Sequence, residues 1–253
     1  MDSVTFFFML GVVQGILEWL PVSSSGNVTL LLVTIAHVPF SEAVKVSFFL
    51  HCGTMLSVVV KFRSHVCELT KDALSLKRTP FLDFYVTAMV ASAVSGIPFL
   101  LLLEAEIPEY IGSLVIAFFL VVTGIVIRTQ KKGLKSITES SIFDACMVGV
   151  AQGISVIPGI SRSGMTVSAL LARGVNQKEA LQMSFLLSVP PVLGLMILSF
   201  SEFQWVYLAS MAASFVCSLL SMEILLKMAQ KLDFSYFCFA VAAATVLIVV
   251  FLY

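Results

Sequence analysis

Uninterrupted apolar segments, long enough to cross a lipid bilayer, dominate this chain. A spanning helix needs about 20 predominantly apolar residues, with about 17 as a working minimum, because the hydrocarbon core is about 30 Å thick. Val46–Val60 is slightly short, but Lys61 and Phe62 extend it, since long side chains can reach the membrane surface. Five further segments meet the minimum: Phe84–Leu103, Ile111–Ile127, Leu181–Phe200, Trp205–Leu226 and Tyr236–Tyr253. We therefore expect six spanning helices.

The composition excludes a water-soluble domain. Apolar residues make up 59% of the chain, charged residues only 12%, and the mean hydropathy is +1.03. Soluble domains are about 45–50% apolar and about 25% charged. The formal net charge is zero, so no basic field favours nucleic acid as a partner.

Two other regions combine short apolar stretches with a polar turn. Val4–Leu17 leads through Glu18 and the turn Ser23–Asn27 into the short apolar run Val28–Val38. Ala145–Ile157 likewise leads through Pro158-Gly159 and Ser161–Gly164 into Met165–Leu171. Irregular backbone at membrane depth is tolerated only where protein buries it or water reaches it. We therefore predict two re-entrant helical hairpins whose turns line a cavity.

The two hairpin regions are copies of one another. Gly11–Gly26 and Gly149–Gly164 align without a gap and are identical at eight of 16 positions, whereas chance would give about one or two, so the match indicates an internal repeat. Downstream, Ser47–Leu50 recurs as Ser184–Leu187. The chain thus divides into a first repeat, residues 1–127, and a second repeat, residues 140–253, each with one hairpin and three spans.

Three spans are an odd number, so the second repeat is expected to lie upside down relative to the first. Basic residues test this topology, because Lys and Arg are enriched in cytoplasmic loops. If Val46–Val60 ends in the cytoplasm, 13 of the 15 Lys and Arg lie there, Lys45 lies outside and Arg162 lies in a hairpin turn. The sequence predicts one all-α membrane domain, residues 1–253, with inverted-topology repeats. Both termini and the first hairpin would lie on the outer side of the plasma membrane.

Charged and hydroxyl side chains in the two turns mark a candidate site. Gln14 and Glu18 are four residues apart and share a helix face, and a carboxylate at membrane depth costs about 2.5–3.5 kcal/mol. The Ser23–Ser25 turn offers donors that favour an anion at a helix start, although such a turn is also an ordinary helix cap. Arg162 has a planar fork suited to phosphate. Its alternatives are a position at the cytoplasmic surface or a purely structural pair with Glu18.

These motifs resemble a known family. Gly11–Gly26 (GVVQGILEWLPVSSSG) and Pro158–Thr166 (PGISRSGMT) resemble the two signature motifs of the undecaprenyl-diphosphate phosphatase family, the bacitracin-resistance type. Ser184–Pro190 and the hydropathy of the whole chain are also similar to that family. The resemblance implies an integral membrane enzyme that removes the terminal phosphate of a C55 polyprenyl diphosphate. Its product would be the monophosphate carrier used in the synthesis of cell-wall peptidoglycan.

By position, the resemblance implies catalytic roles for Glu18, Ser24 and Arg162. Where the family usually has His after the serine turn, this chain has Asn27, which cannot act as acid, base or nucleophile. His51 stands where the family commonly has an amide and is a candidate to supply the missing imidazole. A hydrogen bond from His51 to a backbone carbonyl is the alternative. The residues expected to bind substrate phosphates are Gln14, Ser23, Ser25, Gly26, Asn27, Ser161, Ser163, Gly164 and Thr166.

The expected chemistry is phosphoryl transfer, which needs mainly positioning and charge neutralisation. Arg162 and the backbone N–H groups of both turns would hold the diphosphate, with Mg²⁺ or Ca²⁺ bridging its oxygens and Glu18 as base or metal anchor. Ser24, or a water that it orients, would attack the terminal phosphorus. Expected partners are the polyprenyl diphosphate and the lipid bilayer, with no nucleic acid and with a homodimer as a further candidate. The alternative function is a flippase for a polyprenyl phosphate with weak or no hydrolysis, because inverted repeats also build transporters.

Overall fold

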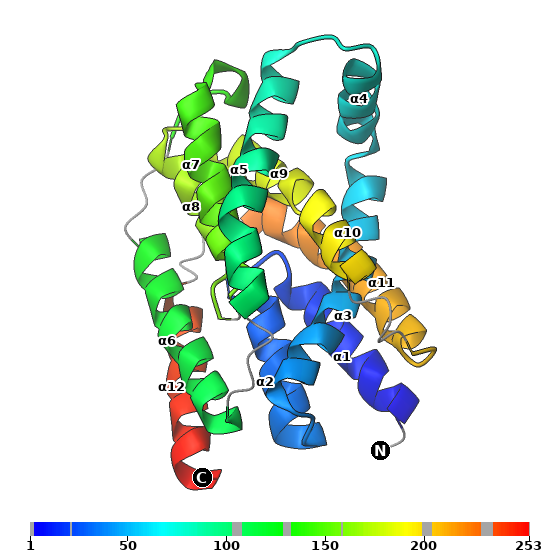
Figure 1. The fold of residues 1–253 in the computed structure, drawn as a ribbon, viewed down its shortest axis with the longest axis vertical. Helices are drawn as coiled ribbons and strands as arrows, with labels where there is room; N and C mark the ends of the chain where they lie inside the picture. Colours follow the sequence, from blue (N-terminus) through cyan, green and yellow to red (C-terminus); the bar gives the residue numbers. More distant parts are fainter. Residues whose placement is uncertain are drawn as a thin grey trace.

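The computed structural model describes residues 3–20, 22–102, 108–128, 133–157, 159–198, 204–228 and 235–252. Over these residues the chain is almost entirely helical (Figure 1), and its β-structure is limited to two isolated bridges between residues 133–135 and 175–176. The elements are α1 (Ser3–Leu17), α2 (Ser24–Ala36), α3 (Phe40–Lys61), α4 (Arg63–Leu74), α5 (Pro80–Leu102), α6 (Glu109–Arg128), η1 (Ile137–Glu139), α7 (Ile142–Ile154), α8 (Arg162–Ala172), α9 (Gln177–Leu187), α10 (Val189–Leu198), α11 (Tyr207–Met228) and α12 (Ser235–Leu252).

Four stretches of the described residues are long and apolar enough to cross a membrane. They are Phe40–Lys61, Pro80–Phe99, Gln177–Ile197 and Tyr207–Lys227. This confirms the expectation of an all-α, multi-pass membrane protein. In α6 and α12 the apolar stretches are shorter, Tyr110–Val126 and Cys238–Phe251, so a total of six spans stays a prediction.

Two predicted segment boundaries differ from the structure. The span expected over Leu181–Phe200 begins earlier and consists of two helices, α9 and α10, which meet at Ser188. Pro190 and Pro191 lie in the first turn of α10, where a proline is tolerated because its missing N–H has no helical partner there. The ends expected at Leu103, Phe200 and Tyr253 lie outside the described residues.

Apolar side chains face outward along the helices, as expected for a protein whose solvent is lipid, and the interior combines apolar clusters with many buried polar side chains. Large apolar side chains are exposed along the helices, among them Val94, Leu220 and Phe251. Many serines are buried instead, including Ser47 and Ser184. Several of these buried hydroxyls donate to a carbonyl one turn earlier in their own helix, so their burial leaves no hydrogen bond unmade.

The two hairpins approach each other from opposite ends of the molecule. In Figure 1, α1 and α2 rise from the lower end, α7 and α8 descend from the upper end, and their turns meet near the middle. Helix α1 packs along α11, and α7 packs along α5. Each hairpin therefore rests on a long apolar helix from the other half of the chain.

Pairs of glycines four residues apart permit both packings. A Cβ atom added to any of the four would lie within 2.6 Å of a carbonyl oxygen on the facing helix, closer than real Cβ contacts come. The pairs are Gly11 with Ser210 (2.2 Å), Gly15 with Ser214 (2.6 Å), Gly149 with Ala88 (2.3 Å) and Gly153 with Ser92 (2.6 Å). Small residues at this spacing let membrane helices approach closely. The glycines thus allow the first helix of each hairpin to pack closely against its long neighbour.

Gly149→Val should destabilise the fold by about 1–3 kcal/mol, because the new side chain has to force α7 away from α5. Unfolding by an ionic detergent, followed by circular dichroism, measures this loss. The matched control is Gly194→Val, since a Cβ at Gly194 meets no atom within 4 Å. Equal losses in the two variants would contradict the close packing of α7 on α5.

The open end of the second hairpin is tied by ion pairs. Asp144, in the first turn of α7, accepts a hydrogen bond from Lys135 at 2.9 Å and forms an ion pair with Arg173, which follows α8. Because Asp144 is buried, its two cationic partners are what make its burial tolerable. The pairs hold the starting end of α7 against the finishing end of α8.

Candidate functional site

The site lies where the two hairpin turns touch. The Gly159 N–H of the second turn donates to Ser23 Oγ of the first at 3.1 Å, and Ser163 Oγ donates to the Leu20 carbonyl at 2.9 Å. Gly26 lies at the same junction, where a Cβ atom would come within 3.1 Å of the Gly159 nitrogen. The two turns therefore form a single wall.

Equivalent serines start the second helix of each hairpin. Ser23 Oγ accepts from the Gly26 N–H at 3.3 Å, and Ser161 Oγ accepts from the Gly164 N–H at 3.1 Å. These are ordinary N-caps, so the expectation that a serine turn can simply cap a helix is met at both positions. Ser23 adopts a left-handed backbone conformation, with φ of 54°, which is uncommon for a non-glycine residue.

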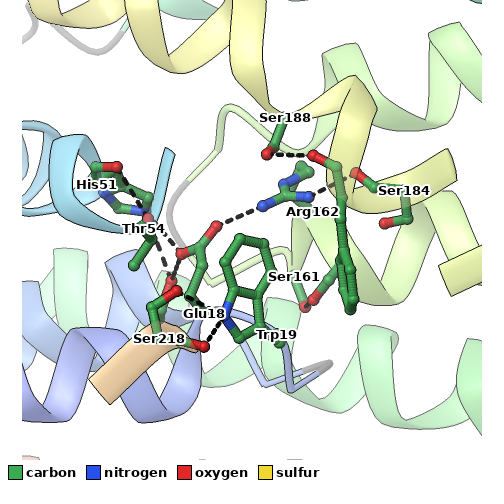
Figure 2. Close-up of polar contacts among 12 residues, drawn as sticks. Glu18, Trp19, His51, Thr54, Ser161, Arg162, Ser184, Ser188 and Ser218 are labelled. Atoms are coloured by element: carbon green, nitrogen blue, oxygen red, sulfur yellow. Dashed lines mark hydrogen bonds and ion pairs between the residues drawn. The ribbon is translucent and has the colours of Figure 1, made fainter. Parts of the chain in front are cut away.

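Glu18 is the centre of the site (Figure 2). Its side chain is buried, and its Oε2 accepts from Gln14 Nε2 at 2.8 Å and from Ser24 Oγ at 2.6 Å. Its Oε1 forms an ion pair with Arg162 from the opposite hairpin. A buried carboxylate is costly unless it is paired and hydrogen-bonded, and Glu18 meets both conditions. The predicted meeting of Glu18, Ser24 and Arg162 is what the structure contains.

His51 reaches the same carboxylate from α3. Its Nε2 lies 3.2 Å from Glu18 Oε2 and 3.5 Å from Ser24 Oγ. Its Nδ1 lies 2.7 Å from the Ser47 carbonyl oxygen. A carbonyl only accepts, so Nδ1 carries a proton and donates to Ser47. Nε2 faces the Glu18 carboxylate and the Ser24 hydroxyl. His51 therefore makes the backbone contact and also lies beside Glu18; whether it replaces the family imidazole stays a prediction.

Arg162 is positioned by α9 and by the turn that follows α1. One guanidinium nitrogen, Nη1, donates to the Ser184 carbonyl at 2.9 Å, while Nη2 faces Glu18. The guanidinium carbon lies 5.9 Å from the centre of the Trp19 ring, within the range of a cation–π contact. Trp19 is held in turn by its indole N–H, which donates to Ser218 Oγ of α11 at 2.8 Å. Arg162 is therefore fixed in the site in a half-buried position, with 18% of its side chain exposed.

A cavity of about 90 Å³ opens beside these residues. Its polar wall contains most of the predicted site residues, and its apolar wall comes from the second hairpin, α3 and α10. The lining residues are Glu18, Ser23, Ser24, Ser25, Phe48, His51, Ser92, Gln152, Ser155, Val156, Ile160, Ser161, Arg162, Ser163, Ser188, Pro191, Val192 and Leu195. A polar end with an apolar flank suits an amphiphile with an anionic head.

Comparison with known proteins decides the family. The model of the family described as bacitracin resistance protein BacA matches residues 7–247. This chain belongs to the BacA family. A relative from Methanococcoides burtonii named undecaprenyl-diphosphatase is 36% identical, with 98% of both chains covered. Relatives with the same name from Methanopyrus kandleri and Thermosipho africanus are 37% and 34% identical and cover 95% and 92% of this chain.

Several of the residues predicted to bind phosphate lie behind the cavity wall of this BacA-family protein. The Asn27 amide donates to the Val22 and Ser23 carbonyls at 2.8 and 2.9 Å, and so holds the first turn. Thr166 Oγ1 donates to the Arg162 carbonyl at 2.8 Å. Together with Gln14, Gly26 and Gly164, these residues are absent from the described lining. Ser25 and Ser163 do line the cavity.

Sequence reasoning missed four polar residues of the lining: Ser92, Gln152, Ser155 and Ser188. The internal repeat could have identified two of them, because they align with predicted site residues of the first repeat. Gln152 aligns with Gln14, and Ser188 aligns with His51 when Ser47–Leu50 is matched to Ser184–Leu187. Ser92 lies on α5 within an apolar segment, and nothing in the local sequence distinguishes it from a serine that bonds only its own helix.

A divalent cation has one carboxylate available here. Among the described residues no group of three or more His, Cys, Asp or Glu could hold a metal ion. Next to Glu18, the Oε1 atom of Gln14 is buried without a hydrogen-bond partner, and amide oxygens are ligands for Mg²⁺ and Ca²⁺. The residues therefore fit a cation that is held mainly by substrate oxygens and not a cation in a complete protein cage.

Proposed function

We propose that this protein removes the terminal phosphate from a long-chain polyprenyl diphosphate of the undecaprenyl type, yielding the lipid monophosphate and inorganic phosphate. The observation that carries the proposal is Glu18, a buried carboxylate that contacts Arg162, Ser24 and His51 beside one cavity. The names of the family relatives support it. Those names describe a phosphatase, so they favour hydrolysis over the flippase alternative.

Substrate binding exchanges one partner of Arg162 for another. With no substrate bound, Glu18 neutralises the guanidinium. A terminal phosphate entering the cavity presents oxygens that a guanidinium binds with two parallel hydrogen bonds. Arg162 then turns from the carboxylate to the phosphate, while the Ser184 carbonyl and the Trp19 ring keep it in place. The exchange leaves Glu18 free to accept a proton.

The proton path starts at Ser24. Its hydroxyl already donates to Glu18 at 2.6 Å, and His51 Nε2 stands 3.5 Å away. Either the Ser24 oxygen or a water that it orients attacks the terminal phosphorus, and the nucleophile's proton passes to Glu18 or His51. The bond from phosphorus to the bridging oxygen breaks, and the lipid monophosphate leaves. If Ser24 is the nucleophile, water then cleaves the phosphoserine.

We propose that Mg²⁺ or Ca²⁺ accompanies the diphosphate, with Glu18 as its protein ligand. The cation would offset the charge of the phosphate oxygens. Mg²⁺ commonly binds through one or two carboxylates together with substrate phosphates. This sharing is consistent with a site that offers a single carboxylate.

We also propose that residues 1–127 and 140–253 are inverted repeats with six spans in the plasma membrane. Matching hairpins and matching contacts support this: α1 packs on α11 as α7 packs on α5. The marked chain ends lie at the same end of the molecule, opposite to α4 and to the start of α7 (Figure 1). The positive-inside rule places the end with α4 in the cytoplasm. A homodimer stays a prediction.

Cysteine labelling tests this sidedness. His37 follows α2 and Ser75 follows α4, and both are exposed. In a Cys67→Ser background, His37→Cys should react in intact cells with a thiol reagent that cannot cross the membrane, whereas Ser75→Cys should react only after permeabilisation. Equal labelling of both in intact cells would contradict the topology.

His51→Gln should slow hydrolysis by about 10- to 100-fold, near the lower end of the range for proton-transfer catalysis. The effect is limited because Glu18, closer to Ser24 than His51 is, can still accept the proton. Rates of phosphate release under saturating lipid measure it. The control is His65→Gln, on the exposed side of α4. A fully active His51→Gln would remove the imidazole from the mechanism.

The proposed function is tested by adding a defined polyprenyl diphosphate to the purified protein in detergent. We expect release of one phosphate per lipid, with a polyprenyl monophosphate as the other product, after addition of Mg²⁺ or Ca²⁺. Mass spectrometry identifies the lipid product. Binding of the lipid without phosphate release, under every cation tried, would instead favour the flippase.

A further inference from the structure

The cavity has a second polar cluster that the mechanism does not use. Ser92 from α5 and Gln152 and Ser155 from the second hairpin line it together, and we call them the neutral cluster. All three are nearly buried, with 7%, 2% and 9% of their surface exposed. Gln152 Nε2 donates to Ser92 Oγ at 3.2 Å, and Ser155 Oγ donates to the Gln152 carbonyl at 2.5 Å.

Gln152 is incompletely hydrogen-bonded. Its Oε1 atom is buried and has no partner among the residues that the structure describes. An unsatisfied buried polar atom is costly, and in a native protein it calls for an explanation. A hydroxyl both donates and accepts, so the amide can also bond Ser92 through its oxygen and turn its nitrogen to the cavity. Only in this second orientation does the amide offer a donor to a phosphate, because an amide oxygen can only accept.

The repeat explains why this cluster is uncharged. Gln152 corresponds to Gln14, but the position corresponding to Glu18 is Val156. The second hairpin therefore keeps the glutamine and lacks the carboxylate, and Gln152 pairs with Ser92 where Gln14 pairs with Glu18. The cavity thus has a charged end, which contains Glu18 and Arg162, and a neutral end.

We propose that the neutral cluster binds the phosphate that remains on the lipid. This inference rests on the proposed function, because it assigns the second phosphate of the same diphosphate. The charged end suits the reacting phosphate, where charge develops during transfer. The retained phosphate needs a position but must also leave with the product. Uncharged donors hold a phosphate less strongly than a guanidinium does, because only one partner of each hydrogen bond is ionised, so they meet both needs.

The test is binding of polyprenyl monophosphate to the purified protein, measured by titration calorimetry. This measurement does not need hydrolysis. Gln152→Met and Ser92→Ala should each raise the Kd for the monophosphate by about 10- to 100-fold, as expected for losing one hydrogen bond to a charged group. Inorganic phosphate, which probes the charged end, should bind both variants as it binds the unmodified protein. Ser210→Ala, a buried serine of α11 outside the lining, should change neither Kd.

Three results would overturn the proposal. The first is unchanged monophosphate binding in Gln152→Met with a lower unfolding temperature, which would make the cluster a helix-packing contact only. The second is loss of monophosphate binding in Arg162→Lys without loss in Gln152→Met. The third is an altered cation requirement with unchanged lipid affinity, which would make these oxygens cation ligands. Monophosphate binding that depends on Gln152, in a protein that releases no phosphate, would defeat the proposed function and leave this assignment standing.

Discussion

Glu18→Gln should lower the rate constant for phosphate release by about 10³-fold, within the range of 10²–10⁴ for losing a general base. The amide matches the carboxylate in size but cannot accept the proton of Ser24 or of a water. It also no longer neutralises Arg162, so the guanidinium is available to phosphate and the KM should stay the same or fall. Steady-state phosphate release with varied lipid separates kcat from KM.

Glu223→Gln is the matched control for that experiment. Glu223 is an exposed carboxylate on α11 that pairs with Lys61 and Lys227, so the same chemical change away from the cavity should leave kcat unaltered. A Glu18→Gln protein that is folded by circular dichroism and hydrolyses at the normal rate would show that Glu18 serves only to pair Arg162.

Arg162→Lys should reduce kcat/KM by about 10²- to 10³-fold, the cost of losing one donor that stabilises developing charge. Lysine keeps the positive charge but has a single ammonium group. It has no second nitrogen with which to bond the Ser184 carbonyl and a phosphate at the same time. It also lacks the planar group that lies over the Trp19 ring. The same lipid assay measures the loss, and both kcat and KM should worsen.

Arg173→Lys supplies the comparison. Arg173 follows the same helix, α8, and its ion pair with Asp144 at the open end of the hairpin should tolerate a lysine. Equal losses in Arg162→Lys and Arg173→Lys would point to a general need for arginine in this hairpin and away from a phosphate site.

The sequence predicted the parts of the fold that have a repeated or periodic signature. The hairpin turns and the meeting of Glu18 with Arg162 followed from two aligned motifs and from the cost of charge in lipid. Helix α4 was not predicted, because Arg63–Leu74 is rich in charge and reads as a cytoplasmic loop. The break between α9 and α10 at Ser188 was not predicted, because the surrounding segment is continuously apolar. Pro190 and Pro191 in that segment could have indicated it.

The details of the site depended on contacts between elements distant in sequence. Asn27 stands where the family usually has His, and this difference pointed to His51 as the source of an imidazole. Only the packing of α3 against the first turn, however, places Nε2 of His51 beside Glu18. The pairing of Gln152 with Ser92 joins residues 60 positions apart. Glycines four residues apart allow the hairpins to approach α5 and α11 closely. Their spacing could be seen in the sequence, but the sequence did not indicate which helix they would face.

The ion pair between Glu18 and Arg162 bears on how a cell makes this protein. The two residues are 144 positions apart, and Ser218, which holds Trp19, lies 199 positions after its partner. During synthesis the first hairpin therefore enters the membrane carrying a carboxylate whose cation has not yet been translated. A chain that stops before α8 has Ser24 and His51 beside Glu18 but lacks the Arg162 guanidinium, so we expect a truncated product not to hydrolyse the lipid. Activity begins only when the last third of the polypeptide has been inserted and has closed on the first.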